Sequence, residues 1–414
     1  MCAKWNSDYD FGLLITGLET LRVTDTAGQA AFSGYEYEDY MSVLQSAVRF
    51  SARLPETERR RIVRTAVFAA LRSGTLTSKR VIAEISKQEK GFLGLQLKRF
   101  VLATSLSISY FNSIGSRQTH NARITFSLSL PKAFDRSSLL KRALRQGITE
   151  LPRDYTQVRI SLRGRSEFEA ADLALDAFDL IRGTWNLTLN HTLIGRISSG
   201  RLHSRLEPVN QLLPGPIHTL HEPNGKPATD TFWYEPSVLP GPFKAIDIQS
   251  KWKRIQRLEG GIRKKLASSS YRADIEDGIR AYTRALDATD FNAAFLNLWR
   301  LLERLTHSLS DPYKVARKRA LFLMNGRDRD FHDQVLKHLT DYRNRAVHAG
   351  EETDEIETLV FQLKFYVERL LFFHIYNNFP GMREAAGFLD LPTLTGDLRK
   401  KIKMMEKAIR FHKA

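Results

Sequence analysis

The chain has 414 residues, more than one ordinary hydrophobic core accommodates, so we expect two or three domains. Its hydrophobic content of 42% and charged content of 26% favour folded domains over long disordered tails. With 63 Lys and Arg against 46 Asp and Glu, the formal net charge is +17, and polyanions are the expected partners, nucleic acid first and an acidic protein second.

Cysteine content and targeting signals predict a compartment. The single cysteine, Cys2, excludes an intrachain disulfide and fits a reducing cytoplasm. The first ten residues lack the basic stretch followed by an apolar stretch that marks a secretory signal. No run approaches the roughly 20 apolar residues that a membrane span needs. We therefore expect a cytoplasmic protein without a membrane partner.

The first part of the chain mixes strand-like and helix-like patterns, which predicts an α+β module over residues 1–245. Strands are expected in segments 11–23, 124–130, 158–162 and 185–189. Helical spacing of apolar residues predicts helices within segments 55–90 and 167–181. Residues 206–243 are rich in proline and glycine and predict a long loop or an interdomain connection.

A basic run follows, and we assign residues 246–270 to a basic linker. From Tyr271 onward the pattern is helical and predicts an all-α bundle over residues 271–414. Asp290 is the expected N-cap of one of its helices. The apolar stripes of five expected helices begin at Ile275, Phe291, Phe331, Ile356 and Leu398.

The stretch Y-R-N-R-A-V-H-A-G, residues 342–350, contains the strongest candidate site. Arg343 and His348 are five positions apart, and on one continuous helix they would point about 140° apart. Ala349-Gly350 and the acidic run that follows suggest a change of geometry. We expect a break or bend between two helices that lets Arg343 and His348 converge.

These residue types suit RNA cleavage by internal attack of the 2′-hydroxyl. Histidine titrates near neutral pH and can act as general acid or base. Arginine stays cationic and can donate two hydrogen bonds to phosphate oxygens. Asn344 is placed to orient the phosphate or the imidazole. No metal is required, because the substrate supplies its own nucleophile.

The motif also resembles a known family. R-N-x-x-x-H, preceded by Tyr342 and followed by Ala349-Gly350, resembles the R-x(4–6)-H motif of the HEPN superfamily of helical nucleases. The stretch F-L-N-L-W-R-L-L-E-R-L, residues 295–305, resembles the second helix of Apea-like HEPN domains, a branch associated with anti-phage and abortive-infection proteins. The resemblance covers residues 271–380, about a quarter of the chain, and none of the first 240 residues.

The resemblance implies roles for individual residues. Arg343 and His348 are the implied catalytic pair, Asn344 their polar companion, and Glu303 an acidic residue facing the site. It further implies a homodimer with both motifs at the interface, products ending in a 2′,3′-cyclic phosphate, and a defence or toxin role.

Partners follow from charge and organisation. Arg345 and the basic residues Lys264 and Lys265 are expected to bind or guide RNA, tRNA or another cellular RNA. Such basic runs are also typical of exposed helix faces. The N-terminal module is expected to sense a phage-derived component or a protein trigger and to restrain the nuclease.

Two other interpretations remain open. In the first, a non-catalytic HEPN-like scaffold binds RNA, a nucleotide or a protein partner, with Arg343 paired to Glu351 or Glu303 and His348 capping a helix. In the second, the protein is a DNA-binding regulator, although no helix-turn-helix spacing stands out. No phosphate loop, dinucleotide loop or zinc-type spacing is present, so we expect no cofactor and no metal. His307, His332, His338 and His374 lack the H-E-x-x-H spacing.

Overall fold

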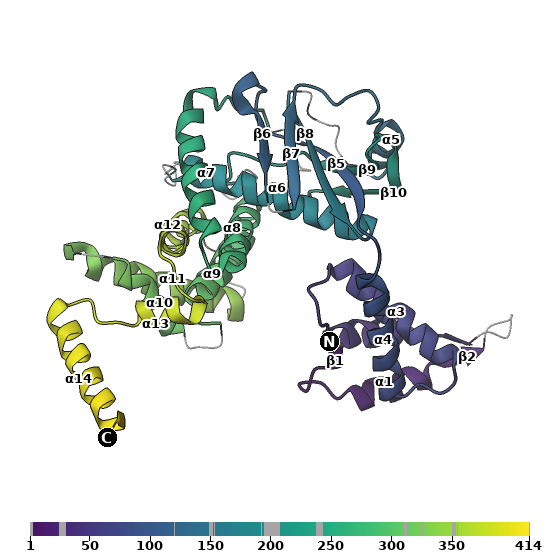
Figure 1. The fold of residues 1–414 in the computed structure, drawn as a ribbon, viewed down its shortest axis with the longest axis horizontal. Helices are drawn as coiled ribbons and strands as arrows, with labels where there is room; N and C mark the ends of the chain where they lie inside the picture. The colour runs from purple at the N-terminus through teal and green to yellow at the C-terminus, as the bar shows by residue number, and fades with distance from the viewer. Residues whose placement is uncertain are drawn as a thin grey trace.

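The computed structural model describes residues 3–24, 30–119, 121–148, 152, 154–191, 193, 208–236, 243–309, 313–324, 326–349, 353 and 355–413. The protein is mixed α/β, about 60% helical, with a six-stranded sheet. Figure 1 shows a small N-terminal unit, a sheet with helices beside it, and a group of helices formed by the last part of the chain. None of the described helices is both long and apolar enough to cross a membrane.

The N-terminal unit has a hydrophobic core of its own, built from residues 3–93. Its helices are α1 (Phe11–Thr20), α2 (Glu36–Ser46), α3 (Glu56–Arg72) and α4 (Ser78–Leu93). Two short antiparallel pairs join them, β1 (Lys4–Trp5) with β4 (Val48–Arg49) and β2 (Arg22–Thr24) with β3 (Ala30–Phe32). The helices expected within residues 55–90 are confirmed as α3 and α4.

The expectation of strands across residues 11–23 is wrong for most of that segment. Asp10 caps α1 by accepting a hydrogen bond from the Leu13 amide at 3.0 Å, and the buried Leu14, Ile15 and Leu18 share one helical face. Gly17 lets α1 approach α2 closely, because a Cβ at this position would lie 2.4 Å from the Tyr40 ring. Only residues 22–24 are extended, as β2.

The central sheet is antiparallel and has the strand order β10-β9-β5-β8-β7-β6. Its strands are β5 (Lys98–Leu106), β6 (Ser116–Gln118), β7 (Ala122–Ser127), β8 (Thr156–Gly164), β9 (Ile217–His221) and β10 (Pro227–Tyr234). The strand expected at residues 158–162 is confirmed as part of β8, and the strand expected at residues 124–130 is confirmed only for residues 124–127, because β7 ends at Ser127. Both alternate buried and more exposed residues, as strands with one covered face do.

Strands β9 and β10 correct the expectation of a loop across residues 206–243. Pro227 opens β10, an edge strand, where a missing amide donor is tolerated. Gly225 makes the tight turn between the strands with a φ of +92°, and a Cβ there would lie 2.4 Å from the Ala133 carbonyl oxygen. The short helix α5 (Ser137–Arg145) packs beside this hairpin.

Helix α6 (Glu167–Asn190) lies along the sheet and is shared by two hydrophobic cores. The strand expected at residues 185–189 is wrong, because this segment forms the last turns of α6. Trp185 is fully buried, 5.3 Å from the Phe126 ring and 5.1 Å from the Trp252 ring. A helix buried on all sides shows no amphipathic period, so the sequence pattern did not indicate it.

The segment expected to be a basic linker, residues 246–270, contains helix α7 (Trp252–Ala267) instead. Its basic residues face outward, while Trp252, Ile255, Ile262 and Leu266 are buried at helical spacing. Glu259, on the same buried face, pairs with Arg117 at 2.8 Å. Helix α7 therefore belongs to the packed structure of both cores.

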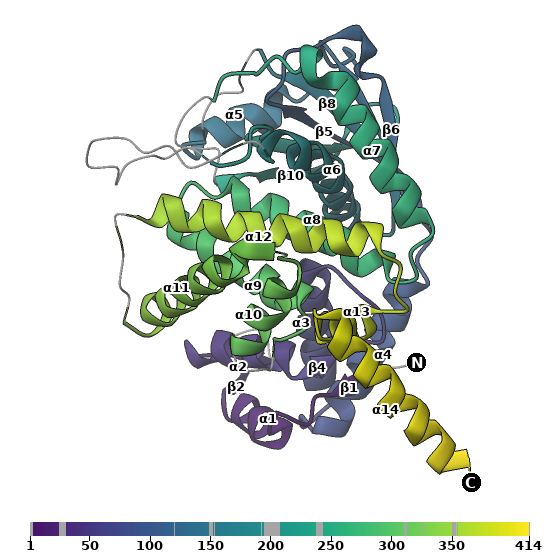
Figure 2. The same cartoon turned by 90° about the vertical axis from the view of Figure 1, so that its left-hand side faces the viewer.

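After α7 the described elements are helices. They are α8 (Arg272–Asp287), α9 (Phe291–Leu305), α10 (Tyr313–Phe322), the 3-10 turn at Gly326–Asp328, α11 (Arg329–Ala349), α12 (Ile356–Tyr376), α13 (Met382–Leu389) and α14 (Thr395–Lys413). The helices expected from their apolar stripes are confirmed as α8, α9, α11, α12 and α14. Figure 2 shows α12 crossing the middle of this group, with α11 on one side and α7 on the other.

Candidate functional site

The candidate motif lies within one continuous helix. Helix α11 runs unbroken from Arg329 to Ala349 and includes the backbone of both Arg343 and His348. The break expected between these two residues is therefore absent, and their directions from the helix axis differ by about 140°. The side chain of His348, like Gly350 and Glu351, lies outside the described part of the chain.

Tyr342 fixes the position of α11 against α9. Asp290 caps α9 by accepting hydrogen bonds from the Asn292 and Ala293 amides, as expected. The Tyr342 hydroxyl donates to Asn292 Oδ1 at 2.7 Å, and its ring meets the Phe295 ring edge-on at 4.9 Å. The residue before Arg343 is thus buried and oriented by two contacts.

Arg343 stacks on an aromatic ring and forms no ion pair with a carboxylate in the described part of the chain. Its guanidinium lies over the ring of Tyr313, the first residue of α10, at 4.2 Å from the ring centre. Its Nε is shielded from solvent and donates no hydrogen bond. Among the described residues, no Asp or Glu is close enough to Arg343 for an ion pair. A half-buried guanidinium in this state is suited to bind an anion.

Glu303 lies in the same neighbourhood and already has a partner. Its Oε1 accepts a hydrogen bond from Trp299 Nε1 at 2.9 Å. The Trp299 ring is 6.3 Å from the Tyr313 ring, edge to face. Contacts therefore run from Glu303 through Trp299 and Tyr313 to Arg343. The direct Arg343–Glu303 ion pair that the scaffold interpretation expects is not formed, and Glu351, its other expected partner, lies outside the described residues.

The two residues after Arg343 differ in environment. Asn344 is half-buried, and its Oδ1 accepts no hydrogen bond although it is shielded from solvent. Arg345 is exposed. Among the described residues, Asn344 Oδ1 and Arg343 Nε are therefore two buried polar atoms of the motif without a hydrogen-bond partner.

Lys264 and Lys265 are not brought to the motif. Both are exposed on the last turn of α7. Helix α7 lines a cavity together with Phe372 and Tyr376, at the C-terminal end of α12. The motif precedes the opposite end of α12, and 21 helical residues span about 30 Å. Figure 2 shows α7 and α11 on opposite sides of α12.

An open groove of about 1000 Å³ lies between α11 and α12 and was not predicted. Aromatic residues dominate its lining, with cations among them: Phe331, Phe361, Phe365, Phe372, Lys364 and Arg369. Arg369 stacks on Phe365 at 4.4 Å, and Phe331 keeps 65% of its surface exposed. The sequence showed Phe331 as part of an apolar stripe, but a stripe does not reveal whether a neighbour covers it.

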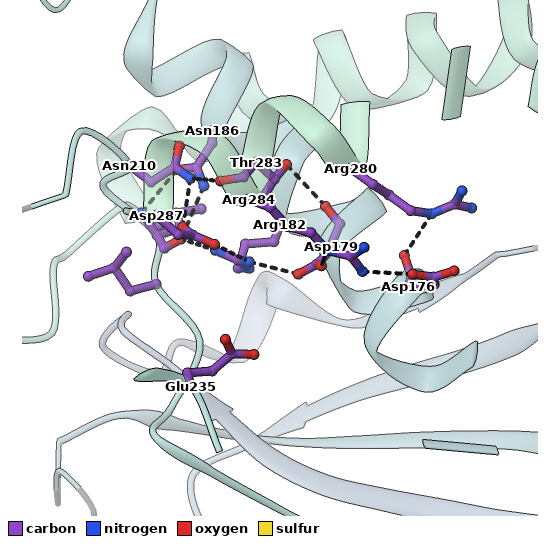
Figure 3. Close-up of polar contacts among 12 residues, drawn as sticks. Asp176, Asp179, Arg182, Asn186, Asn210, Glu235, Arg280, Thr283, Arg284 and Asp287 are labelled. Carbon is purple, nitrogen blue, oxygen red and sulfur yellow. Dashed lines mark hydrogen bonds and ion pairs between the residues drawn. The ribbon is translucent and has the colours of Figure 1, made fainter. Parts of the chain in front are cut away.

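A buried ionic network, which was not predicted, joins the sheet region to the helices (Figure 3). Arg182 of α6, only 1% exposed, contacts Asp179 of α6 and Asp287 of α8 at 2.7 Å each. Arg284 of α8 contacts Asp179 at 2.7 Å, and Asn210 donates to Asp287 at 2.7 Å. Burial acts to raise the pKa of Asp179, but the two arginines outweigh it and lower this pKa. Asp179 and Asp287 each have a buried arginine partner, which indicates a structural role, although Arg182 Nε donates no hydrogen bond to any described residue.

The candidate histidines have core or surface roles. His374 is buried, contacts the Leu305 carbonyl through Nε2 at 2.7 Å, and burial lowers its pKa. His332 contacts the Tyr366 hydroxyl at 2.9 Å, and His338 is exposed. Within the described ranges, no three His, Cys, Asp or Glu side chains are grouped to hold a metal ion.

Searches among models of known protein families, curated proteins and solved structures find no match to this chain.

Proposed function

We propose that the C-terminal helices form a HEPN-type, metal-independent endoribonuclease. The observation that carries this proposal is the state of Arg343: a guanidinium stacked on Tyr313, with no carboxylate partner among the described residues, in a helix that ends at Ala349, one residue after His348. Asn344, the next residue, also has a side-chain oxygen without a hydrogen-bond partner among the described residues, and this supports a site that is completed by a bound ligand.

The proposed reaction uses the substrate's own nucleophile. The 2′-oxygen forms a bond to phosphorus while the bond from phosphorus to the 5′-oxygen breaks, leaving a 2′,3′-cyclic phosphate and a 5′-hydroxyl. Arg343 binds the non-bridging oxygens, where negative charge increases. His348 takes the proton from the 2′-hydroxyl or gives one to the leaving 5′-oxygen. Asn344 positions the phosphate.

The substrate we propose is single-stranded cellular RNA, such as a tRNA loop. The groove between α11 and α12 presents aromatic rings on which unstacked bases can lie, with the exposed Arg369 beside them. The net charge of +17 attracts RNA to the protein as a whole. The N-terminal unit and the sheet region are proposed to sense a trigger during anti-phage defence and to keep cleavage at a low basal rate until then.

The proposed site is shared by two chains. Because α11 is unbroken, Arg343 and His348 of one chain point about 140° apart. A homodimer with the two motifs facing each other lets Arg343 of one chain act with His348 of its partner. This arrangement agrees with the dimer that the HEPN resemblance implies.

The test is cleavage of end-labelled tRNA and mixed cellular RNA in the presence of EDTA. We expect cleavage by the full-length protein and a loss of about 100- to 10,000-fold with His348→Ala. His338→Ala is the matched control, because His338 is exposed ten positions earlier on the same helix. Equal activity of both variants, or no cleavage when RNA binding is saturated, would refute the proposal.

The scaffold interpretation is the second candidate, and the unbroken α11 is the observation that favours it. If Arg343 and His348 never meet, the same cation on Tyr313 still binds a phosphate without cleaving RNA. This candidate predicts salt-sensitive RNA binding that Arg343→Ala weakens, with no turnover by any variant.

A further inference from the structure

Helix α14 stands off the body of the protein, as Figures 1 and 2 show from two directions. Among the described elements, none packs along it. It carries seven Lys and Arg, including the cluster at residues 399–403, against Asp397 and Glu406. A 19-residue helix without tertiary packing is only marginally stable in water, so its exposed apolar side chains call for a partner.

Those apolar side chains form one narrow stripe. Leu398, Ile402, Met405 and Ile409 are spaced by four, three and four residues, and at 100° per residue they fall within about 60° of one another. Ile402, Met405 and Ile409 are 54%, 57% and 55% exposed. Met404 and Phe411 lie on another side of the helix. A narrow stripe at this spacing is the seam of a two-stranded coiled coil, whereas a helix lying on a lipid surface needs a much broader apolar face.

We propose that α14 pairs in parallel with α14 of a second copy of this chain. The heptad places Ile402 and Ile409 at a positions and Leu398 and Met405 at d positions, a combination that favours parallel dimers.

The charges beside the seam agree with this pairing. Lys401 occupies a g position, and Glu406 the e position that faces it from the partner helix. A parallel pair thus forms two Lys401–Glu406 ion pairs, one on each side. Of the other basic residues, Lys400, Lys403, Lys407 and Arg410 occupy b and f positions that point away from the seam, and Arg399 and Lys413 occupy e positions beside it. Parallel pairing also places both protein bodies at the same end of the coiled coil.

The test uses disulfide cross-linking of the full-length protein in a Cys2→Ser background, which removes the only natural cysteine. Identical a positions face each other in a parallel pair, within the roughly 4.4–6.8 Å Cα separation that a disulfide needs. We expect Ile402→Cys to form a covalent dimer under mild oxidation. Lys403→Cys, one residue further at an outward b position, should stay monomeric on a denaturing gel.

A second measurement keeps the inference separate from the proposed nuclease dimer. The pair Ile402→Glu and Ile409→Glu places four carboxylates in the seam of the dimer. We expect it to weaken dimerisation at least 10-fold in light scattering without loss of helix content elsewhere. Equal cross-linking of the two cysteine variants, an unchanged dimer after the glutamate substitutions, or binding of the wild-type monomer to anionic phospholipid vesicles through this stripe would overturn the inference, whatever the outcome of the RNA assay.

Discussion

At the scale of single residues, the site depends on how Arg343 is held. Sequence reasoning identified Arg343, Asn344 and Glu303, and the structure places Arg343 and Glu303 in one neighbourhood. The residues that connect them, Trp299 and Tyr313, were not predicted, because their roles depend on how α9, α10 and α11 pack. The sequence also suggested a break after Arg343 that the helix does not have.

Substitutions of Glu303 distinguish a structural role of this residue from a catalytic one. Its carboxylate accepts a hydrogen bond from Trp299, and an amide oxygen can accept the same bond. If Glu303 only positions Trp299, Glu303→Gln retains RNA cleavage within about 3-fold, while Glu303→Ala loses part of it together with about 1 kcal/mol of stability. Loss of about 100-fold or more in Glu303→Gln, with unchanged thermal stability, would show that the carboxylate takes part in the chemistry.

At the scale of elements, the patterns that predicted correctly were amphipathic. Strands β7 and β8 and helices α8, α9 and α12 each have one covered face, which leaves a period in the sequence. The prediction for the second half of α6 was wrong because this segment is buried between two cores and its apolar residues show no helical period. Strands β9 and β10 were predicted as a loop because proline and glycine concentrate at their ends and in the turn between them. Helix α7 was predicted as a linker because the many basic residues of its exposed face obscured the apolar spacing of its buried face.

The contact between α3 and α6 predicts a pH dependence. Burial, with Asp176, Glu56 and Glu58 nearby, raises the pKa of Asp172 from 3.8 to about 6. The folded state therefore binds a proton more tightly than the unfolded state, so this group's contribution to stability is present below about pH 4 and is lost as the pH rises through 6. We expect Asp172→Asn to be more stable than wild type at pH 7.5 and no more stable at pH 4 in urea denaturation. A difference that is constant with pH would contradict this.

The groove between α11 and α12 predicts a separate contribution to RNA binding. Phe331 is 65% exposed, so Phe331→Ala should leave the fold intact. Loss of one stacked base weakens binding by about 1–3 kcal/mol, or about 5- to 150-fold. Fluorescence anisotropy with a labelled single-stranded RNA measures this effect. Phe411→Ala is the control, because Phe411 is 78% exposed on α14, outside its apolar stripe. Equal affinities of the two variants would exclude the groove as an RNA site.

At the scale of the whole molecule, a buried network of ion pairs connects the sheet region to the helical region. It consists of Asp179, Arg182, Arg284 and Asp287. Removing one partner of a buried ion pair typically destabilises a protein by about 3–5 kcal/mol. The network lies in the contact between α6 and α8. Sequence patterns cannot predict such a network, because its partners are about 100 residues apart.

The shared site makes a prediction about mixed dimers. Arg343→Ala and His348→Ala should each be inactive alone. Mixing them under conditions that allow subunit exchange creates mixed dimers with one intact pair, Arg343 from one chain and His348 from the other. Random pairing of two equal pools makes half of the dimers mixed, and each mixed dimer has one of its two sites intact. Activity should therefore rise to about a quarter of that of the wild type. Measured by RNA cleavage rate, no recovery despite demonstrated exchange would place both residues in the same chain's site or in none.

We propose that this chain cleaves RNA by 2′-hydroxyl attack at the Arg343–His348 motif. Mass spectrometry of the ends formed from a defined RNA, with EDTA present, tests it most directly. We predict a 2′,3′-cyclic phosphate on one fragment and a 5′-hydroxyl on the other, both missing with His348→Ala and with RNA that carries a 2′-O-methyl group at the cleaved position. Ends with a 3′-hydroxyl and a 5′-phosphate, or the same fragments from the His348→Ala protein, would contradict the account.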